Sequence, residues 1–197
     1  MAVLSITQLS ADVKLGLWKI VESVPDLLQR FPHLEEQISK YHNVERKRQK
    51  LAVYALLYAM IGNGKQIIEH NDNGKPLLKN YCISISDTKG YVAVIISKKS
   101  NVAVDIEYFS NRVNRIAHRF IREDEVATTT EEQLIFWSVK ETIYKYYSEQ
   151  NLHYCDMRLH SFSLEKDNRV LVDNLYEETS RTVYYYLNSE YALTYTY

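Results

Sequence analysis

Two carboxylates stand two residues apart in a short apolar run of the sequence. Asp105 and Glu107 alternate with Val104 and Ile106, and this alternation is typical of a strand over Val102–Glu107. A period of two points both carboxylates to one face of the strand and both aliphatic side chains to the core. Because like charges so close together repel each other, a divalent metal ion is their natural third partner. The alternative is an exposed strand face with two solvated acids.

A second set of reactive side chains follows on a strong predicted helix, Glu131–Tyr147. Trp137, Glu141 and Lys145 are spaced by four residues, so they share one helix face. The alternative here is an ordinary Glu–Lys pair on a solvated face, which stabilises a helix by only about 0.2–0.5 kcal/mol. A neighbouring face of the same helix forms a core stripe that consists of Ile135, Val139, Thr142, Ile143 and Tyr146.

The segments that must position these side chains are a mixture of helices and strands. Glu45–Met60 has the pattern of a long helix, basic in its first turns and apolar afterwards. Three strand-like runs, Tyr81–Ser86, Tyr91–Ser97 and Val102–Glu107, are joined by short connections and predict an antiparallel meander. Further helices are expected at Arg112–Phe120 and Glu123–Val126, and further strands at Ser161–Glu165, Arg169–Val172, Thr182–Leu187 and Tyr191–Tyr195.

The order of these elements repeats along the chain. Helical material precedes a small antiparallel sheet twice, and no low-complexity linker separates the two parts. We therefore expect an α+β fold with a single body over residues 1–197, made of an N-terminal half, 1–100, and a C-terminal half, 101–197, that carries the paired acids.

Composition excludes several classes of protein. The 24 Lys and Arg balance 25 Asp and Glu, so no overall field attracts nucleic acid or an anionic membrane. The five glycines form neither of the common glycine-rich phosphate loops. Two cysteines are too few for a disulfide framework, and the longest uncharged run, residues 51–64, is too short to span a bilayer. We expect a cytoplasmic protein with reduced thiols.

Taken together, Val102–Glu107 and Trp137–Lys145 resemble the two-part signature of the 4′-phosphopantetheinyl transferases, in particular the larger, pseudo-dimeric type that activates surfactin synthetase. The resemblance covers about residues 44–165. It is supported by Gly74-Lys75-Pro76, by Ile85–Thr88 and by the basic helix that begins near Arg46. It implies two similar α+β halves with small antiparallel sheets, related by pseudo-twofold symmetry, with a nucleotide cleft between them.

The activity implied by this resemblance is the transfer of the phosphopantetheine arm of coenzyme A to a serine of an acyl or peptidyl carrier protein, with release of 3′,5′-ADP. The implied cofactor is magnesium, with manganese as the alternative, and its ligands would be Asp105, Glu107 and Glu141. Glu141 would also be the base for the serine proton, directly or through a water on the metal. Lys140 and Lys145 would pair with the phosphates and stabilise the leaving group.

The resemblance also implies where coenzyme A and the carrier protein bind. Lys75, with Pro76, would approach the adenosine, and Arg46 the 3′-phosphate; the alternative for Arg46 and its basic neighbours is a solvated first turn. Ser86 and Thr88 join this coenzyme-binding set. Ile116, Phe120 and Ile121 would meet the carrier, with simple core packing as the alternative. The expected state is a monomer, and the coenzyme and the carrier are the only expected partners.

One departure from the family pattern bears directly on activity. Asp87 stands where the family usually has a phosphate-binding histidine, so a donor is replaced by an acid that repels phosphate. Asp87 must then turn away, bind metal or weaken the affinity for coenzyme A. A competing hypothesis follows, in which the protein still binds carriers or coenzyme A but has lost turnover. A third, an unrelated α+β protein with a chance motif, predicts no coenzyme A binding.

Overall fold

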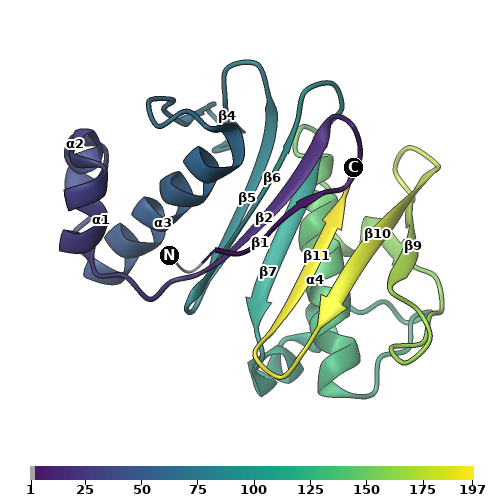
Figure 1. The fold of residues 1–197 in the computed structure, drawn as a ribbon. Coiled ribbons are helices and arrows are strands. Elements are labelled where there is room, and N and C mark those ends of the chain that lie inside the picture. Colours follow the sequence, from purple (N-terminus) through teal and green to yellow (C-terminus); the bar gives the residue numbers. More distant parts are fainter. Residues whose placement is uncertain (1–2) are drawn as a thin grey trace. The chain divides into compact units, whose positions relative to one another are not determined.

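The computed structural model describes residues 3–197. The chain forms two compact units, which divide between Ser100 and Asn101, and each unit contains helices and a small antiparallel sheet (Figure 1). The expected α+β class is confirmed. We describe each unit by itself.

The N-terminal unit contains a four-stranded antiparallel sheet with the order β1-β2-β6-β5. The Asp87-bearing strand β5 is therefore an edge strand, and it is paired with β6 along its whole length. The hairpin between them closes at Gly90, where a φ of 80° favours glycine. The bounds are β1 Val3–Gln8, β2 Val13–Lys19, β5 Cys82–Thr88 and β6 Tyr91–Ser97.

A long helix, α3 (Val44–Ile61), packs on this sheet. The Asn43 side chain caps its first turn, and Gly62 ends it in the left-handed conformation. Helix and sheet approach closely at Gly16, where an added Cβ would lie 2.6 Å from the sulfur of Met60. Three short helices lie on the side of α3 away from the sheet (Figure 1): α1 (Val24–Arg30), η1 (Pro32–Leu34) and α2 (Glu35–Ser39). A two-stranded ribbon of β3 (Glu69–His70) and β4 (Pro76–Leu77) completes the unit.

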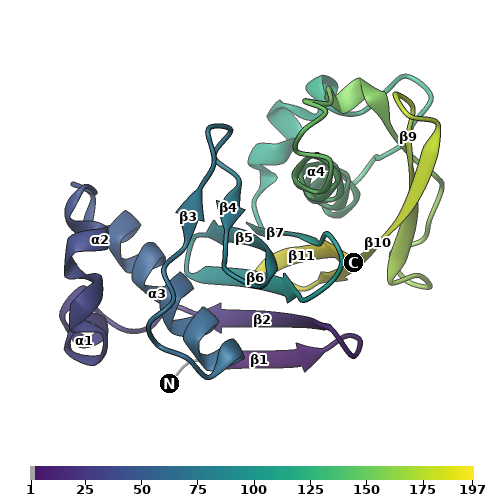
Figure 2. The same ribbon diagram turned by 90° about the horizontal axis from the view of Figure 1, so that it is seen from above.

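The C-terminal unit consists of a five-stranded antiparallel sheet around one helix, α4 (Thr130–Tyr146). Thr129 and Glu132 form a capping box at the start of α4, and Figure 2, which looks nearly along its axis, shows the sheet curving around the helix. The strand order is β7-β11-β10-β9-β8, with bounds β7 Ala103–Tyr108, β8 Met157–Leu159, β9 Arg169–Asn174, β10 Thr179–Leu187 and β11 Tyr191–Thr196.

Three expectations about the elements are wrong. The predicted meander does not form, because β7 pairs with β11 instead of β6. The segments expected as helices after β7 are the 3₁₀ turns η2 (Asn111–Arg115) and η3 (Ala117–Arg119), followed by irregular turns. Residues 161–165 are not a strand, because Asp167 accepts a hydrogen bond from the Ser163 amide (2.7 Å) and closes a turn there.

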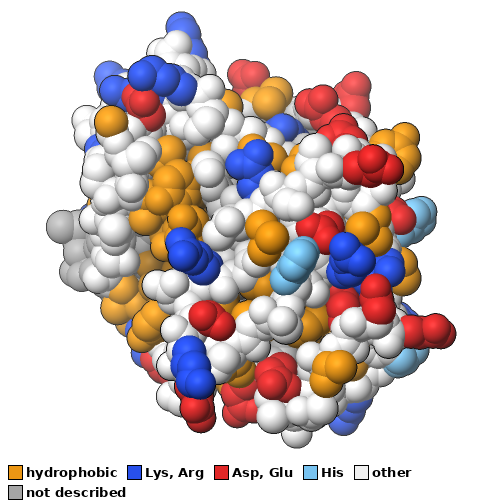
Figure 3. All heavy atoms as spheres, turned by 90° about the vertical axis from the view of Figure 1, so that its right-hand side faces the viewer, with side chains coloured by type: hydrophobic (Ala, Val, Ile, Leu, Met, Phe, Trp, Pro, Cys, Tyr) orange, Lys and Arg blue, Asp and Glu red, His pale blue; other side chains and the backbone are white. Residues whose placement is uncertain are grey.

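The distribution of charged side chains on the surface agrees with the balanced numbers of acidic and basic residues. On the face drawn in Figure 3, acidic and basic side chains are interspersed. Among residues 3–197, no helix is both long and apolar enough to cross a membrane. Cys82 and Cys155 are exposed free thiols. The pseudo-twofold relation between the units and the nucleotide cleft between them remain predictions.

Candidate active site

Asp105 is the buried centre of the candidate site. It lies on β7 opposite Thr194 of β11, and only 3% of its surface is exposed. Helix α4 approaches it at two levels, because Ser138 Oγ donates to Asp105 Oδ2 (2.8 Å) and Lys145 Nζ donates to Oδ1 (2.7 Å). Burying a carboxylate is costly unless it is paired and hydrogen-bonded, and both conditions are met here.

A chain of buried hydroxyls supports Asp105 from behind. Ser138 Oγ lies 2.9 Å from Thr194 Oγ1, which in turn lies 2.6 Å from Thr142 Oγ1. All three side chains are fully buried. The motif spacing did not reveal Ser138 or Thr194 as part of the candidate site. For Ser138, the one available signal is that it is a hydroxyl residue in an otherwise apolar part of the helix. These hydroxyls link strand and helix and fix the orientation of the carboxylate.

Glu107 is held by the first aromatic residue of the helix motif. Trp137 Nε1 donates to Glu107 Oε1 (2.9 Å). Burial and, next, the neighbouring Asp105 carboxylate raise the pKa of Glu107 to about 7, against the opposing effects of the Trp137 hydrogen bond and of Lys145. The spacing of two residues therefore does bring two acids to one site, as the strand pattern predicted.

Glu141 belongs to the same group of acids. Tyr154 donates its phenolic proton to Glu141 Oε1 (2.7 Å). Burial raises the pKa of Glu141, the Tyr154 hydrogen bond opposes this shift, and the charge of Asp105 adds to it. The charges of Asp105 and Lys145 thus act on both Glu107 and Glu141, with opposite effects on the pKa of each glutamate.

The chemistry of these donors fits a magnesium ion, which prefers a few carboxylate oxygens together with water and phosphate. Within residues 3–197, however, no group of three or more His, Cys, Asp or Glu side chains is arranged as it stands to hold a metal ion. In the structure, Lys145, Trp137 and Tyr154 each donate to one of the three acids. The assignment of these acids as metal ligands remains a prediction.

Lys140 is not brought to this group. Its side chain is fully buried, and its ammonium donates to Glu125 Oε2 (2.7 Å), to the Phe120 carbonyl (2.6 Å) and to the Tyr154 carbonyl (3.2 Å). All three protons are therefore used within the fold, and the expected contact with phosphates is replaced by a buried ion pair. The physical reason is that Lys140 lies about 100° around the helix from Glu141. Phe120 is likewise fully buried, in agreement with the core-packing alternative.

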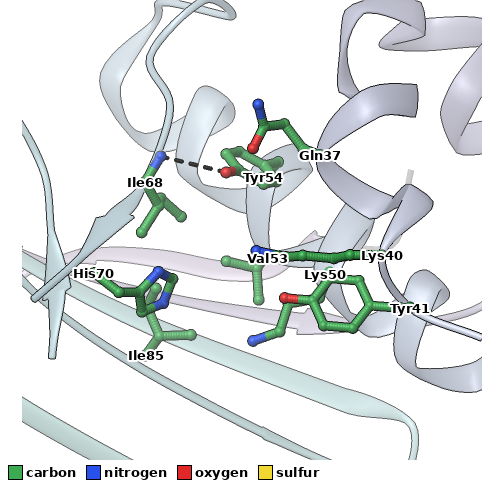
Figure 4. A pocket seen from close by; sticks show the side chains of 9 residues that line it. All are labelled: Gln37, Lys40, Tyr41, Lys50, Val53, Tyr54, Ile68, His70 and Ile85. Atoms are coloured by element: carbon green, nitrogen blue, oxygen red, sulfur yellow. Dashed lines mark hydrogen bonds between the residues drawn. The ribbon is translucent and has the colours of Figure 1, made fainter. Parts of the chain in front are cut away.

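The N-terminal unit has a small pocket lined by basic and aromatic side chains. Figure 4 shows Lys40 and Lys50 extending toward His70, with Tyr41 and Tyr54 beside them. Burial, followed by the charges of Lys50 and Lys40, lowers the pKa of His70, and burial also lowers the pKa of Lys50. A pocket with this composition lacks negative charge. Lys40 and His70 were not identified from the sequence, since neither stands in a recognisable motif.

Asp87 is neutralised by the basic helix. Arg46 NH1 lies 2.5 Å from Asp87 Oδ2, and Lys50 Nζ lies 3.7 Å from Oδ1. The side chain of Asp87 is 11% exposed, against 43% for Arg46. The Asp87 carboxylate therefore does not turn away from the basic helix but pairs with two of its cations. The expectation that Asp87 weakens the affinity for coenzyme A remains a prediction.

The remaining residues predicted to bind the coenzyme are spread over the N-terminal unit. Lys75 and Pro76 stand at the β3–β4 ribbon, where the Lys75 amide donates to the Asn71 side chain (2.9 Å). Ser86 and Thr88 are buried. Because strand side chains alternate, they point to the face of β5 opposite Asp87 and Arg46. Of the predicted coenzyme-binding residues, Arg46 is the one that forms an ion pair with Asp87.

Comparison with known families bears on the C-terminal unit. Residues 101–196 match the family model of the 4′-phosphopantetheinyl transferase superfamily. Over this stretch the chain belongs to that superfamily. No curated protein matches the chain. The matched stretch contains Asp105, Glu107, Glu141 and Lys145, so the acids and the lysine of the candidate site lie within the 4′-phosphopantetheinyl transferase region. The match supports phosphopantetheinyl transfer at the level of the superfamily.

Proposed function

We propose that this protein transfers the 4′-phosphopantetheine arm of coenzyme A to a serine hydroxyl of an apo acyl or peptidyl carrier protein. In this reaction the serine oxygen forms a bond to the β-phosphorus, the pyrophosphate P–O bond breaks, and 3′,5′-ADP leaves. The observation that carries the proposal is the juxtaposition of three carboxylates and Lys145 in the unit that matches the superfamily.

Glu141 is the residue best suited to take the serine proton. Its carboxylate is half-buried, and burial raises the pKa of Glu141 above its usual value, which makes the carboxylate a stronger base. The Tyr154 hydroxyl occupies Oε1 and leaves the other oxygen of Glu141 to accept the proton. The proton would therefore move from the serine Oγ to Glu141 Oε2.

Lys145 balances the charge of the pyrophosphate. Its ammonium already lies 2.7 Å from Asp105, on the same side of α4 as Glu141, and it can donate to a phosphate oxygen as negative charge develops on the leaving group. A magnesium or manganese ion held by Asp105, Glu107 and Glu141 would supply further neutralisation of the pyrophosphate. Lys140 keeps a positioning role, since it fixes the backbone of Tyr154 and, through Glu125, that of Leu159.

The nucleotide end of the coenzyme would bind in the N-terminal unit. Lys40, Lys50 and His70 line a pocket that favours a phosphate. Arg46 is next to this pocket, because Arg46 and Lys50 both form ion pairs with Asp87. The 3′-phosphate would compete with Asp87 for Arg46 and Lys50. Lys75 and Pro76 would approach the adenosine, and Ser86 and Thr88 would contribute only from the opposite face of β5.

The test is incubation of the full chain with magnesium, coenzyme A and a panel of apo carrier proteins, followed by intact mass measurement of the carriers. We expect one carrier class to gain one phosphopantetheine arm, and we expect Glu141→Gln to lose this activity. Glu131→Gln is the matched control, because Glu131 is a solvent-facing acid in the first turn of the same helix. No modified carrier under any condition would contradict the proposal.

The second candidate is a binding protein of the same fold without turnover. The observation that favours it is the Asp87–Arg46 ion pair, which closes a cationic position to phosphate. It predicts that coenzyme A or a carrier protein binds to the chain while the carrier mass stays unchanged.

A further inference from the structure

Tyr154 connects Glu141 with a part of the C-terminal unit that lies beyond the helix α4. It is the first residue of the short turn η4 (Tyr154–Asp156), and its phenol donates to Glu141 Oε1 (2.7 Å). A glutamate side chain has three rotatable bonds, so its carboxylate samples several positions unless a fixed group holds it. The orientation of Glu141 therefore depends on how firmly Tyr154 is itself held.

The ring of Tyr154 is held by aromatic packing. Its centroid lies 5.3 Å from that of Trp137 on α4. The Trp137 ring in turn packs edge-on against the ring of Phe120, which is fully buried, at a centroid distance of 5.3 Å. Such aromatic contacts stabilise a defined arrangement of the rings in addition to burying their surface. The hydroxyl of Tyr154 therefore has a defined place beside α4.

The backbone of Tyr154 is held by a buried ion pair. Lys140 Nζ donates to the Tyr154 carbonyl (3.2 Å) and to Glu125 Oε2 (2.7 Å). The other oxygen of Glu125 accepts a hydrogen bond from the Leu159 amide (2.7 Å). Lys140 and Glu125 thus fix the chain at both ends of the segment 154–159. Neither side chain is exposed, so solvent does not compete for these contacts.

We propose that Tyr154 is a positioning residue for arm transfer, and that Lys140 and Glu125 act on the reaction through it. Tyr154 takes one oxygen of Glu141 and so directs the other toward the serine hydroxyl. Lys140 lies about 100° around α4 from Glu141, so its effect on Glu141 runs through Tyr154. The inference rests on the proposed function, because it assumes that Glu141 acts on the serine, and it requires no metal ion at this site.

The first test compares kcat and KM of arm transfer between wild type and Tyr154→Phe, which keeps the ring and removes the hydroxyl. We expect kcat to fall about tenfold or more, because a misplaced reacting group slows the chemical step, while KM for coenzyme A stays within about twofold. Tyr147→Phe is the matched control, since the Tyr147 hydroxyl contacts Thr179 (3.3 Å), and its kcat should equal that of wild type. An unchanged kcat in Tyr154→Phe, or a change in KM alone, overturns the inference.

The second test asks whether the buried ion pair acts through Tyr154. Lys140→Met combined with Glu125→Leu removes both charges together, so no unpaired charge remains buried. This double variant should lower kcat, and adding Tyr154→Phe to it should lower kcat little further, because both changes act on the same hydroxyl. Losses that multiply would overturn the claim that the pair acts through Tyr154. If circular dichroism shows that the double variant does not fold, Tyr154→Phe alone decides.

Crystal structures of wild type and Tyr154→Phe provide a readout that does not require activity. We expect the Glu141 carboxylate to lose its single orientation in the variant and to occupy another rotamer. An unchanged Glu141 side chain in Tyr154→Phe overturns the inference whether or not wild type transfers the arm. A wild type that modifies no carrier contradicts the proposed function instead, and the two failures are thereby distinguished.

Discussion

Replacing Asp87 by asparagine should tighten the binding of coenzyme A. The substitution keeps the shape of the side chain and removes the negative charge that now pairs with Arg46 and Lys50. Both cations then become available to a phosphate. Because Arg46 is 43% exposed, the ion pair itself contributes little to folding, and we expect the free energy of unfolding to change by less than about 1 kcal/mol.

The size of the effect follows from the distance at which a phosphate would sit. Arg46 NH1 is 2.5 Å from Asp87, so a phosphate hydrogen-bonded to the far edge of the guanidinium lies about 7 Å from the carboxylate. With an effective dielectric constant of about 40–80, the repulsion between one carboxylate charge and two phosphate charges is about 1–2.5 kcal/mol. We therefore expect the Kd of coenzyme A to fall by about tenfold in low salt, and by less as salt screens the charges.

The assay is titration calorimetry of coenzyme A and of dephospho-coenzyme A, which lacks the 3′-phosphate, into wild type, Asp87→Asn and Asp87→His. In Asp87→Asn and Asp87→His, the gain in affinity should be large for coenzyme A and small for dephospho-coenzyme A. Asp87→His should also lower the apparent KM for coenzyme A. Asp12→Asn is the control, since Asp12 pairs with Lys99 (3.0 Å) at a turn of the same unit. Unchanged or weaker coenzyme A binding by Asp87→Asn would refute the assignment of Arg46 and Lys50 to the 3′-phosphate.

Three further outcomes are expected. Asp105→Ala should abolish transfer and lower the free energy of unfolding by about 1–3 kcal/mol, measured by urea denaturation, because Ser138 and Lys145 lose their acceptor. The pKa of Glu107 is about 7 in the folded state, so the free energy of unfolding of the metal-free chain should fall as the pH rises from about 4.5 to 7. In urea titrations across that range, Glu107→Gln should show a smaller dependence of the free energy of unfolding on pH. The same pH dependence in Glu107→Gln and in wild type would contradict the raised pKa. Lys140→Met should cost about 3–5 kcal/mol in thermal or urea unfolding, because it leaves Glu125 buried and unpaired, and the double variant with Glu125→Leu should recover much of that loss.

The parts of the site that follow from local periodicity were predictable from the sequence. A strand period of two places Asp105 and Glu107 together, and a helix period of 3.6 aligns Trp137, Glu141 and Lys145. In the structure, Lys145 donates to Asp105 and Trp137 donates to Glu107. The limits of the main helices and of most strands were also close, because their caps and turns are encoded next to them.

What the sequence did not predict depends on partners that are distant along the chain. Whether β7 pairs with β6 or with β11 depends on side-chain packing across the sheet, and alternation alone is the same for both. The ion pairs of Lys140 with Glu125 and of Asp87 with Arg46 join different elements, so neither spacing nor periodicity gives a sign of them. The family resemblance assigned Lys140 and Arg46 to phosphates, while the fold engages both with carboxylates.

The pairing of β7 with β11 also sets an order of events during protein synthesis. The sheet of the N-terminal unit has all of its strands once residue 97 has been made, so it can fold while translation continues. Strand β7 comes next but waits for β11, whose Thr194 lies opposite Asp105. Until then the acid-bearing strand lacks its β11 partner, and Ser138, which donates to Asp105, lacks the Thr194 hydroxyl. We therefore expect a nascent chain that lacks β11 to expose the edge of β7 that β11 covers, which is a potential site of aggregation.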